Sequence, residues 1–433
     1  MRAYTEELTI PKSDLILGSL SNLAAYYSTC LRNRLPAGAT PIRFVVTRTD
    51  KEGYACELDV VVFGEKDDCG KQDEHNIFSF RKRTYESTEN FTAVLLIPTG
   101  IGAEIGGHCG DGNAVARLLA NACDILITHP NVVNASDINE MTENTLYVEG
   151  SVITRLLMGQ IGLQPVRSNR VLMVMDKHEE RFFNEEIVNA VSSARITLGL
   201  DCDVYEMEKL ITTISRYSAA GRAIGEVNEL QNLFEVVQKY RANYDAIGLS
   251  TFIKVPDHYH ADYFSSDNMI NPWGGVEAIL THSIAEFFNI HCAHAPMMTS
   301  SAIYDLALGI VDPRKAPESA STTYLYCVLK GLHRSPRIVE PTNGTTLEHV
   351  SCVIIPDGCI GLPTLACLEN SIPLIAVREN RNAMRNDLRA LPFRHGQLFI
   401  VENYLEAVGV MMALRAGVAP AAVRRPLEYT RLL

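Results

Sequence analysis

VSCVIIPDGCIGLPTLACLENSIPLIAVREN, residues 350–380, has the pattern of one unit of a parallel β-sheet. VSCVIIP is a continuous apolar run that is typical of a buried strand, and the Asp-Gly pair after it predicts a tight turn. We expect a helix to begin between Cys359 and Thr364, and PLIAV to form the next strand. Two buried strands joined through a helix predict an α/β fold.

The same alternation extends over most of the chain in both directions. TAVLLIPTG, DILITHP, RVLMVMD, YDAIGLST and QLFIV are further apolar runs, separated by helical patterns. We therefore predict two Rossmann-like parallel-sheet domains with a ligand cleft between them. Residues 91–170, with part of the C-terminus, form the first domain. Residues 171–433 form the second domain, with a histidine-rich insertion at about 250–345.

Residues 1–90 have a different pattern and predict a small α+β unit. A helix is expected at Leu15–Leu31, followed by a strand pair formed by PIRFVVTRT and YACELDVVVFG. GEKDDCGKQDEHN, after this pair, predicts a loop. We interpret the unit as an arm of a homo-oligomer or as a lid over the cleft.

The composition limits the classes of partner. The chain has 433 residues and a formal net charge of −12, which argues against a nucleic-acid partner. It contains no apolar run of the roughly 20 residues that a membrane span needs, and its N-terminus lacks the pattern of a signal peptide. Eleven cysteines occur without any C-x-x-C pair, which is typical of reduced thiols. These features predict a cytoplasmic protein with no membrane partner.

A glycine-rich loop, PTGIGAEIGGHCGDGN, follows the strand TAVLLI. Ligands of open parallel sheets bind beyond the carboxyl ends of the strands, where such loops expose backbone N–H groups to anions. The loop lacks the dinucleotide fingerprint, because its third glycine is at position 106 and not 105, and no Gly-Lys-Ser/Thr follows. The alternative is a tight structural turn. The substrate-binding candidates here are Gly100, Gly102, Gly106, Gly107, His108, Asp111 and Asn113.

The loop after the next strand, HPNVVNASDINEM, is dense in short hydrogen-bonding side chains. These groups either form a second wall of the pocket or satisfy the backbone of the loop. The substrate-binding candidates here are His129, Asn131, Asn134 and Asp137.

Five of the twelve histidines fall between residues 258 and 294. We predict that His260, His282 and His294 could hold a divalent metal, zinc or iron, because imidazole nitrogens are common ligands of both. Asp257, Asp262 and Glu277 are carboxylate candidates for the same site. The alternatives are direct contacts to a substrate and purely structural roles.

The stretch at 350–380 supplies the fourth set of candidates. A thiol at a helix N-terminus forms its thiolate more readily, so Cys359 is a candidate nucleophile or acid–base group. His294 and Asp357 complete the predicted catalytic residues. Arginines after the second strand could bind a carboxylate or phosphate through two hydrogen bonds. The substrate-binding candidates here are Gly358, Gly361, Thr364, Arg378, Asn380 and Arg381.

Several motifs together resemble a domain family of unknown function that is common in cyanobacteria: PTGIGAEIGGH, THPNVVNASDINEM, NPWGGVEA, VLKGLHRSPR and PDGCIGLPTLA with IPLIAVRENRN. The resemblance covers about residues 92–433 and implies an enzyme-like protein without a known reaction. Cys109 stands where the pattern has a small residue, and we expect no role for its thiol.

Two local likenesses suggest reactions. The Cys359 segment is similar to the second catalytic loop of the aspartate/glutamate racemase superfamily, although Ser250 and Thr251 stand where those enzymes have their first cysteine. The same segment looks like the donor-binding turn of two-domain glycosyltransferases and nucleotide-sugar epimerases, with Glu369 near the position of the ribose ligand.

The leading hypothesis is an enzyme that acts on a small anionic, carboxylate-bearing metabolite in the interdomain cleft. It would use isomerase- or lyase-type chemistry, with Cys359 as acid–base group or nucleophile. Three alternatives remain: a nucleotide-sugar transferase or epimerase, a metal-dependent lyase or hydrolase that uses the histidines, and a non-catalytic metabolite-binding protein.

Overall fold

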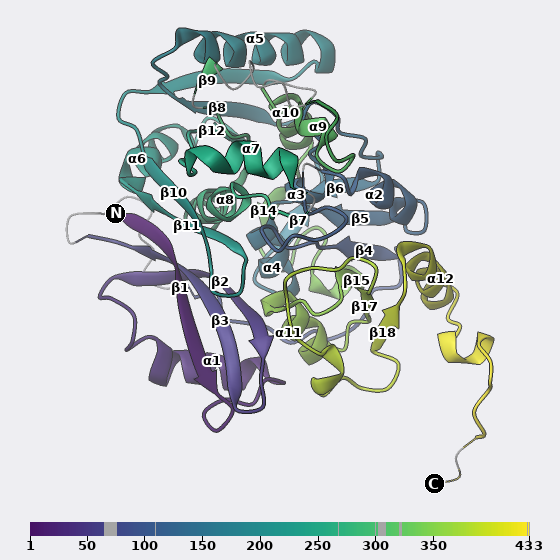
Figure 1. Ribbon diagram of the computed structural model, residues 1–433. Helices are drawn as coiled ribbons and strands as arrows, with labels where there is room; N and C mark the ends of the chain where they lie inside the picture. Colours follow the sequence, from purple (N-terminus) through teal and green to yellow (C-terminus); the bar gives the residue numbers. More distant parts are fainter. Residues whose placement is uncertain are drawn as a thin grey trace.

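The computed structural model describes residues 1–64, 76–108, 110–266, 268–298, 300–301, 309–319, 323–430 and 432. These residues form two parallel sheets, one large antiparallel sheet and a two-stranded antiparallel sheet of β7 and β14, with helices packed around them (Figure 1). The predicted α/β class is confirmed. Most of the predicted loop at 64–76, and Cys109, lie outside the described residues.

The first parallel sheet has six strands. In order across the sheet they are β18 (Leu398–Val401), β17 (Leu374–Val377), β15 (Val350–Pro356), β4 (Thr92–Leu95), β5 (Ile125–Thr128) and β6 (Thr145–Tyr147). The strands after β4 extend to one side of it, and the chain then returns to add β15, β17 and β18 on the other side. The loops after β4 and β15 therefore diverge, and such a reversal of strand order opens a crevice for ligands.

The second parallel sheet has four strands: β13 (His291–His294), β12 (Ala246–Ser250), β8 (Arg170–Asp176) and β9 (Asp201–Met207). Successive residues of β8 belong to separate cores, with Met173 in one and Leu172 in the other. Helices α5 (Arg181–Leu198) and α10 (Tyr326–His333) share the first core, and α6 (Leu230–Tyr240) and α8 (Gly274–Phe288) contribute to the second. Helices therefore cover both faces, as in other buried parallel sheets.

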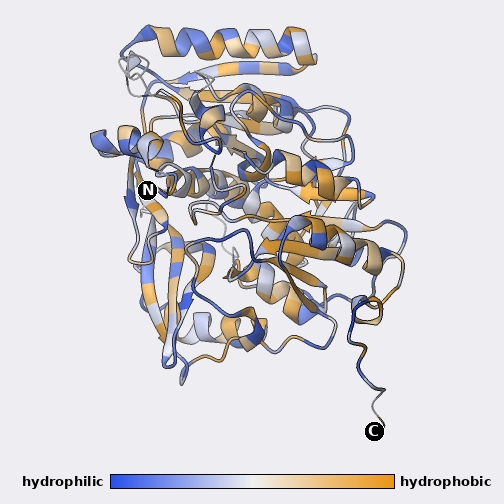
Figure 2. Ribbon diagram, turned by 45° about the vertical axis from the view of Figure 1, so that its right-hand side comes forward, coloured by the Kyte–Doolittle hydropathy of each residue, from blue (hydrophilic) through white to orange (hydrophobic). Residues whose placement is uncertain are grey.

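Figure 2 shows this burial as hydropathy. The strands of the parallel sheets are mostly hydrophobic, whereas α5 at the edge of the molecule alternates hydrophilic and hydrophobic residues. Among the described helices, none combines the length and the apolar composition that crossing a bilayer would require.

The antiparallel sheet joins distant parts of the chain. Its strands, in order, are β10 (Thr212–Tyr217), β11 (Ala223–Asn228), β1 (Arg2–Pro11), β3 (Gly53–Val62), β2 (Ala39–Thr49) and β16 (Ile360–Gly361). The predicted strand pair is present as β2 and β3. The antiparallel sheet contains strands from both sides of the predicted boundary at residue 90, because β1 pairs with β11 and β2 pairs with β16.

The predicted helix at Leu15–Leu31 is shorter in the structure. It consists of α1 (Leu20–Tyr26) and one turn of π-helix (Tyr27–Leu31). The region at 250–345 supplies β13 to the second parallel sheet and α10 to the first core. The remaining elements are α2 (Asn113–Ala120), α3 (Pro130–Val133), α4 (Gly150–Leu157), β7 (Gly162–Gln164), α7 (Asp257–Ser265), α9 (Ala316–Ser319), β14 (Arg337–Val339), α11 (Leu362–Asn370), α12 (Tyr404–Arg415) and short 3-10 turns at Leu347–His349, Leu388–Ala390 and Pro420–Val423.

Candidate functional site

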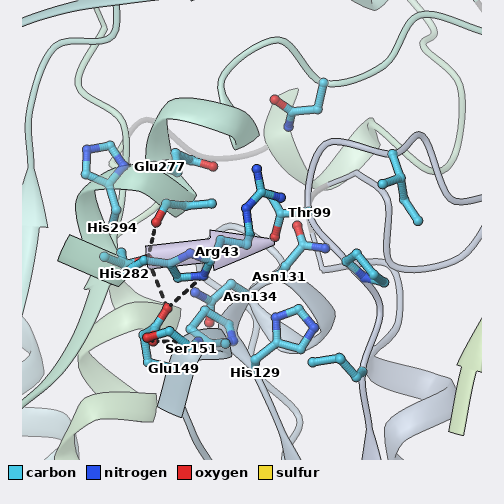
Figure 3. Close-up of a pocket in the computed structure, with 18 of the residues that line it drawn as sticks. Arg43, Thr99, His129, Asn131, Asn134, Glu149, Ser151, Glu277, His282 and His294 are labelled. Carbon is cyan, nitrogen blue, oxygen red and sulfur yellow. Dashed lines mark hydrogen bonds and ion pairs between the residues drawn. The ribbon is translucent and has the colours of Figure 1, made fainter. Parts of the chain in front are cut away.

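A cavity of about 240 Å³ lies beyond the carboxyl ends of β4 and β15, at the reversal of strand order. Loops of the first parallel sheet form one side of it, α8 and the end of β13 form another, and β2 of the antiparallel sheet contributes a third (Figure 3). Three sheets thus meet at one pocket. Its volume is slightly below the roughly 300–1,000 Å³ of pockets for drug-sized ligands, which suits a small metabolite.

The structure divides the predicted site residues into two groups. Those that line the cavity are His108, His129, Asn131, Asn134, His260, His282, His294, Cys359, Gly361 and Thr364. Those outside its lining are Gly100, Gly102, Gly106, Gly107, Asp111, Asn113, Asp137, Asp357, Gly358, Arg378, Asn380 and Arg381.

The glycine-rich loop is a tight turn that is held in place by side chains behind it. Asn380 is fully buried, donates from Nδ2 to the Ile105 carbonyl oxygen (2.9 Å) and accepts from the Ile105 N–H (2.9 Å). Asp111 accepts from the backbone N–H groups of Gly106 and His108, and burial raises its pKa to about 6. A Cβ on Gly107 would lie 2.0 Å from a backbone oxygen. These contacts fix the loop, so they give its glycines a structural role.

The two predicted arginine clamps form ion pairs outside the cavity lining. Arg378 pairs with Glu402 (2.5 Å), and Arg381, whose side chain is 80% exposed, pairs with Glu104 (2.9 Å). Both lie past the end of β17, a strand away from the reversal of strand order. Neither arginine lines this cavity.

Cys359 lines the cavity, but its surroundings do not favour a thiolate. Helix α11 begins at Leu362, after the Gly361 cap, so Cys359 lies before the helix and not at its first turn. Burial, with a smaller contribution from the negative charge of Asp357, raises the pKa of the Cys359 thiol well above its ordinary value. The predicted activation by the helix terminus is corrected accordingly, and the thiol stays protonated at neutral pH.

A carboxylate held by a histidine is the most accessible acidic group on the α8 side. Nδ1 of His294 lies 3.3 Å from Oε1 of Glu277, and Nε2 of His294 lies 2.9 Å from the Thr251 hydroxyl. A carboxylate only accepts hydrogen bonds, so Nδ1 carries the ring proton and Nε2 accepts from Thr251. The Glu277 side chain remains 24% exposed to the cavity, while that of His294 is 1% exposed.

A second pair of this type, Glu149 and His282, is more completely enclosed. Glu149 caps α4, and its Oε2 accepts from the N–H groups of Ser151 (2.8 Å) and Val152 (3.2 Å) and from the Ser151 hydroxyl. Its Oε1 lies 3.2 Å from Nε2 of His282 and 3.3 Å from the Thr281 hydroxyl. Both carboxylate oxygens are engaged, so Glu149 orients His282 and is not itself available as a base (Figure 3).

Two further carboxyl groups in the lining are held neutral. Burial, together with the negative charge of Glu277, raises the pKa of Glu318 to about 8, and Glu318 accepts from Nδ2 of Asn271 (3.1 Å). Burial also raises the pKa of Glu286 to about 8. These raised pKa values favour the protonated forms of Glu286 and Glu318 at pH 7, and a protonated carboxyl group can donate a proton.

The lining also contains Arg43, on β2. Its Nε donates to Asp59 (2.6 Å), which also accepts from the Thr5 hydroxyl (2.7 Å), and its side chain remains 17% exposed. The Asp59 charge balances Arg43 in the interior, while the accessible part of the guanidinium faces the pocket (Figure 3). Below this pair, Arg222 and Glu57 form a second buried ion pair (2.6 Å).

Burial lowers the pKa of four histidines in the cavity lining: His108, His129, His260 and His282. His129 accepts the Ile97 N–H at Nε2 (3.1 Å), and burial lowers its pKa to about 3. His260, His282 and His294 share the lining. Within the described ranges, however, no three His, Cys, Asp or Glu side chains are arranged to hold a metal ion. The structure therefore brings the three predicted ligands to one pocket without forming a ligand set from them.

Sequence reasoning considered Glu277 only as a metal ligand and missed Glu149, Glu318 and Arg43. A signal was present for Arg43, which stands between apolar residues in the predicted strand PIRFVVTRT. A charged residue inside such a run must find a partner or line a polar cavity.

Comparison with known proteins identifies relatives but no reaction. An uncharacterised lipoprotein of Synechococcus sp. is 34% identical over 359 residues, which cover 78% of this chain and 96% of that relative. No solved structure matches the chain. The prediction of a cytoplasmic protein is corrected by this comparison, because the relative is described as a lipoprotein.

The resemblance to a family of unknown function is confirmed, with slightly narrower bounds than expected. Residues 92–424 match the family described as "Protein of unknown function (DUF3326)", which is more than half of the chain. The chain therefore belongs to this DUF3326 family.

Proposed function

We propose that the protein is an enzyme that moves a proton on a small carboxylate-bearing metabolite, in an isomerase- or lyase-type reaction. The observation that carries this proposal is that two carboxyl groups line one cavity in different settings: Glu277 is held by His294, and burial raises the pKa of Glu318 to about 8. A carboxyl group whose pKa is raised by its surroundings can act as a general acid at neutral pH, and a second carboxyl group beside it can act as the general base.

In this proposal Glu277 is the base. Its Oε1 receives the His294 hydrogen bond, and its accessible surface leaves the carboxylate open to a substrate proton. Thr251 fixes the His294 tautomer, so His294 and Thr251 act as positioning residues. Glu318, whose pKa of about 8 keeps it protonated at neutral pH, is the acid that returns a proton at a second atom. Each turnover leaves Glu277 protonated and Glu318 ionised, and proton exchange of both groups with solvent restores the starting states.

Arg43 is the proposed anchor of the substrate carboxylate. A guanidinium has five N–H donors, and Asp59 engages it at Nε. The remaining donors suit a carboxylate, which guanidinium groups bind with two parallel hydrogen bonds. Arg43 takes the place of the arginines that sequence reasoning assigned to this role.

The cleft itself supports a finer description of the fold. Both parallel sheets reverse their strand order, between β4 and β15 in one and between β8 and β12 in the other. We propose that they are two Rossmann-like units, and that the metabolite binds between them, beyond the carboxyl ends of β4 and β13.

The experiment is hydrogen exchange with solvent. The protein is incubated in D₂O with a panel of small 2-hydroxy, 2-amino and 2-oxo acids, and loss of each C–H signal is followed by proton NMR. We expect exchange in at least one compound, slowed about 100-fold or more by Glu277→Gln and unchanged by Glu185→Gln, an exposed residue of α5. Exchange that Glu277→Gln leaves intact would refute the assignment of the base. Binding of panel compounds without any exchange would favour a non-catalytic binding protein.

A further inference from the structure

One wall of the cavity is apolar and has no part in the proposed proton transfer. It is formed by residues of β2, β16 and the start of α11, by the residue after α4 and by two loop residues, whereas the carboxyl groups and histidines come mainly from α7, α8, α9 and β13. We call it the apolar wall, and it consists of Phe44, Ile77, Met158, Ile360, Leu362 and Met384.

Hydrogen bonds connect the segments that carry Phe44, Ile360 and Met384 of the apolar wall. Ile360 of β16 pairs with Val46 of β2, the strand that carries Phe44. Asn386, two residues after Met384, donates to the carbonyl oxygens of Val46 (2.9 Å) and Gly358 (2.8 Å). The loop, the short strand and the long strand are therefore held together by the pairing of β2 with β16 and by the Asn386 side chain.

The apolar wall disfavours the binding of polar groups of a ligand. A hydroxyl or a second carboxylate placed against it would lose its hydration and meet side chains that cannot hydrogen-bond, which costs free energy for each unsatisfied group. A hydrocarbon group placed there would instead gain from leaving water. The wall therefore discriminates between carboxylic acids by what they carry beyond the carboxylate.

We infer that the substrate is a carboxylic acid with an apolar body, aliphatic or aromatic, which packs on the apolar wall while its carboxylate binds Arg43. This inference rests on the proposed function for the carboxylate end and extends it to the substrate class. It excludes bare dicarboxylates and sugar acids as preferred ligands.

The test is a homologous series of ligands. Binding of acetate, butyrate, hexanoate and 3-phenylpropanoate is measured by titration calorimetry, with succinate as the polar comparison. Trp273, the one tryptophan of the chain, lines the cavity, so quenching of its fluorescence shows that binding occurs there. Each buried methylene should tighten binding about fourfold, from roughly 0.8 kcal/mol per CH₂ group. Succinate should bind more weakly than butyrate.

A size-changing variant locates the effect on the wall. Met384→Phe, which fills the space, should weaken hexanoate at least tenfold and leave acetate within twofold, and Met384→Ala should shift the preference towards longer chains. Met412→Phe and Met412→Ala, on a methionine of α12 outside the cavity lining, are the matched controls. They should change neither the affinity for hexanoate nor the affinity for acetate.

The outcomes separate this inference from the proposed function. Affinities that do not change from acetate to hexanoate, or tighter binding of succinate than of butyrate, would overturn the inference even if Glu277→Gln abolishes hydrogen exchange. A fourfold gain per methylene that depends on Met384, with hydrogen exchange unaffected by Glu277→Gln, would support the apolar wall and refute the acid–base assignment.

Discussion

Glu286 should make the stability of this protein fall as the pH rises towards neutrality. The carboxyl group is 3% exposed, and burial raises its pKa from an ordinary 4.5 to about 8. Between these two values the folded state keeps the proton that the unfolded state releases. Stability falls with pH wherever the folded state binds more protons, so this group weakens folding progressively between pH 4.5 and 8.

The size of the effect follows from the same values. Each pH unit in this window changes the free energy of unfolding by about 1.4 kcal/mol, and from pH 4.5 to 7 the change is about 3 kcal/mol. Glu286→Gln keeps the shape and the hydrogen-bonding capacity of the side chain but removes the titration. We expect the variant to gain about 3 kcal/mol over the wild type between pH 4.5 and 7.

The assay is urea unfolding of both proteins at half-unit steps from pH 4.5 to 8.5. Only the difference between the two proteins is read, so titration of other groups cancels. Glu185→Gln, on the exposed face of α5, is the control and should leave a constant difference from the wild type. A constant difference for Glu286→Gln as well would show that burial does not hold this carboxyl protonated.

Three further predictions concern residues in and around the cavity. Arg222→Met should lower the free energy of unfolding by about 3–5 kcal/mol, because it leaves the buried Glu57 without its ion-pair partner. Adding Glu57→Gln should restore much of this free energy, as measured by urea unfolding. The Cys359 thiol should react with iodoacetamide at pH 8 at least 100-fold more slowly than the thiols of the unfolded chain, because burial keeps it protonated; equal rates, read by mass spectrometry, would contradict this. Gly107→Ala should lower the midpoint of thermal unfolding, because its Cβ would overlap a backbone oxygen, whereas Gly409→Ala, where space is open, should not.

The sequence was sufficient to predict the elements that depend on local pattern. The apolar runs at residues 92–95, 125–128 and 350–356 are buried strands, and the polar loops after them do line a cavity. This prediction holds because the carboxyl ends of parallel strands lie at one edge of a sheet, however the other elements pack around it.

The chemistry of the site depends on contacts between residues far apart in the sequence, so it could not be predicted from local sequence patterns. Cys359 has the sequence context of a reactive thiol, yet its pKa is set by burial that the motif does not encode. Glu277 and Glu318 are 41 positions apart in the numbering and become neighbours in the cavity lining only through folding. Arg43 reaches the same cavity because its strand pairs with β16, a contact that no local pattern predicts.

The pairing of β2 with β16 has a consequence for synthesis of the chain. Val46 can pair with Ile360 only after Ile360 has been synthesised, 314 positions later. At roughly 5–20 residues per second, synthesis of this stretch on the ribosome takes about 16–60 s. During that time the edge of β2 has no strand beside it, and an open edge is a site for wrong pairing and aggregation. Such distant contacts also slow folding itself. The pocket is therefore among the last parts of the molecule to be completed, and a nascent chain that is interrupted before residue 361 has the N-terminal strands but no place for a ligand.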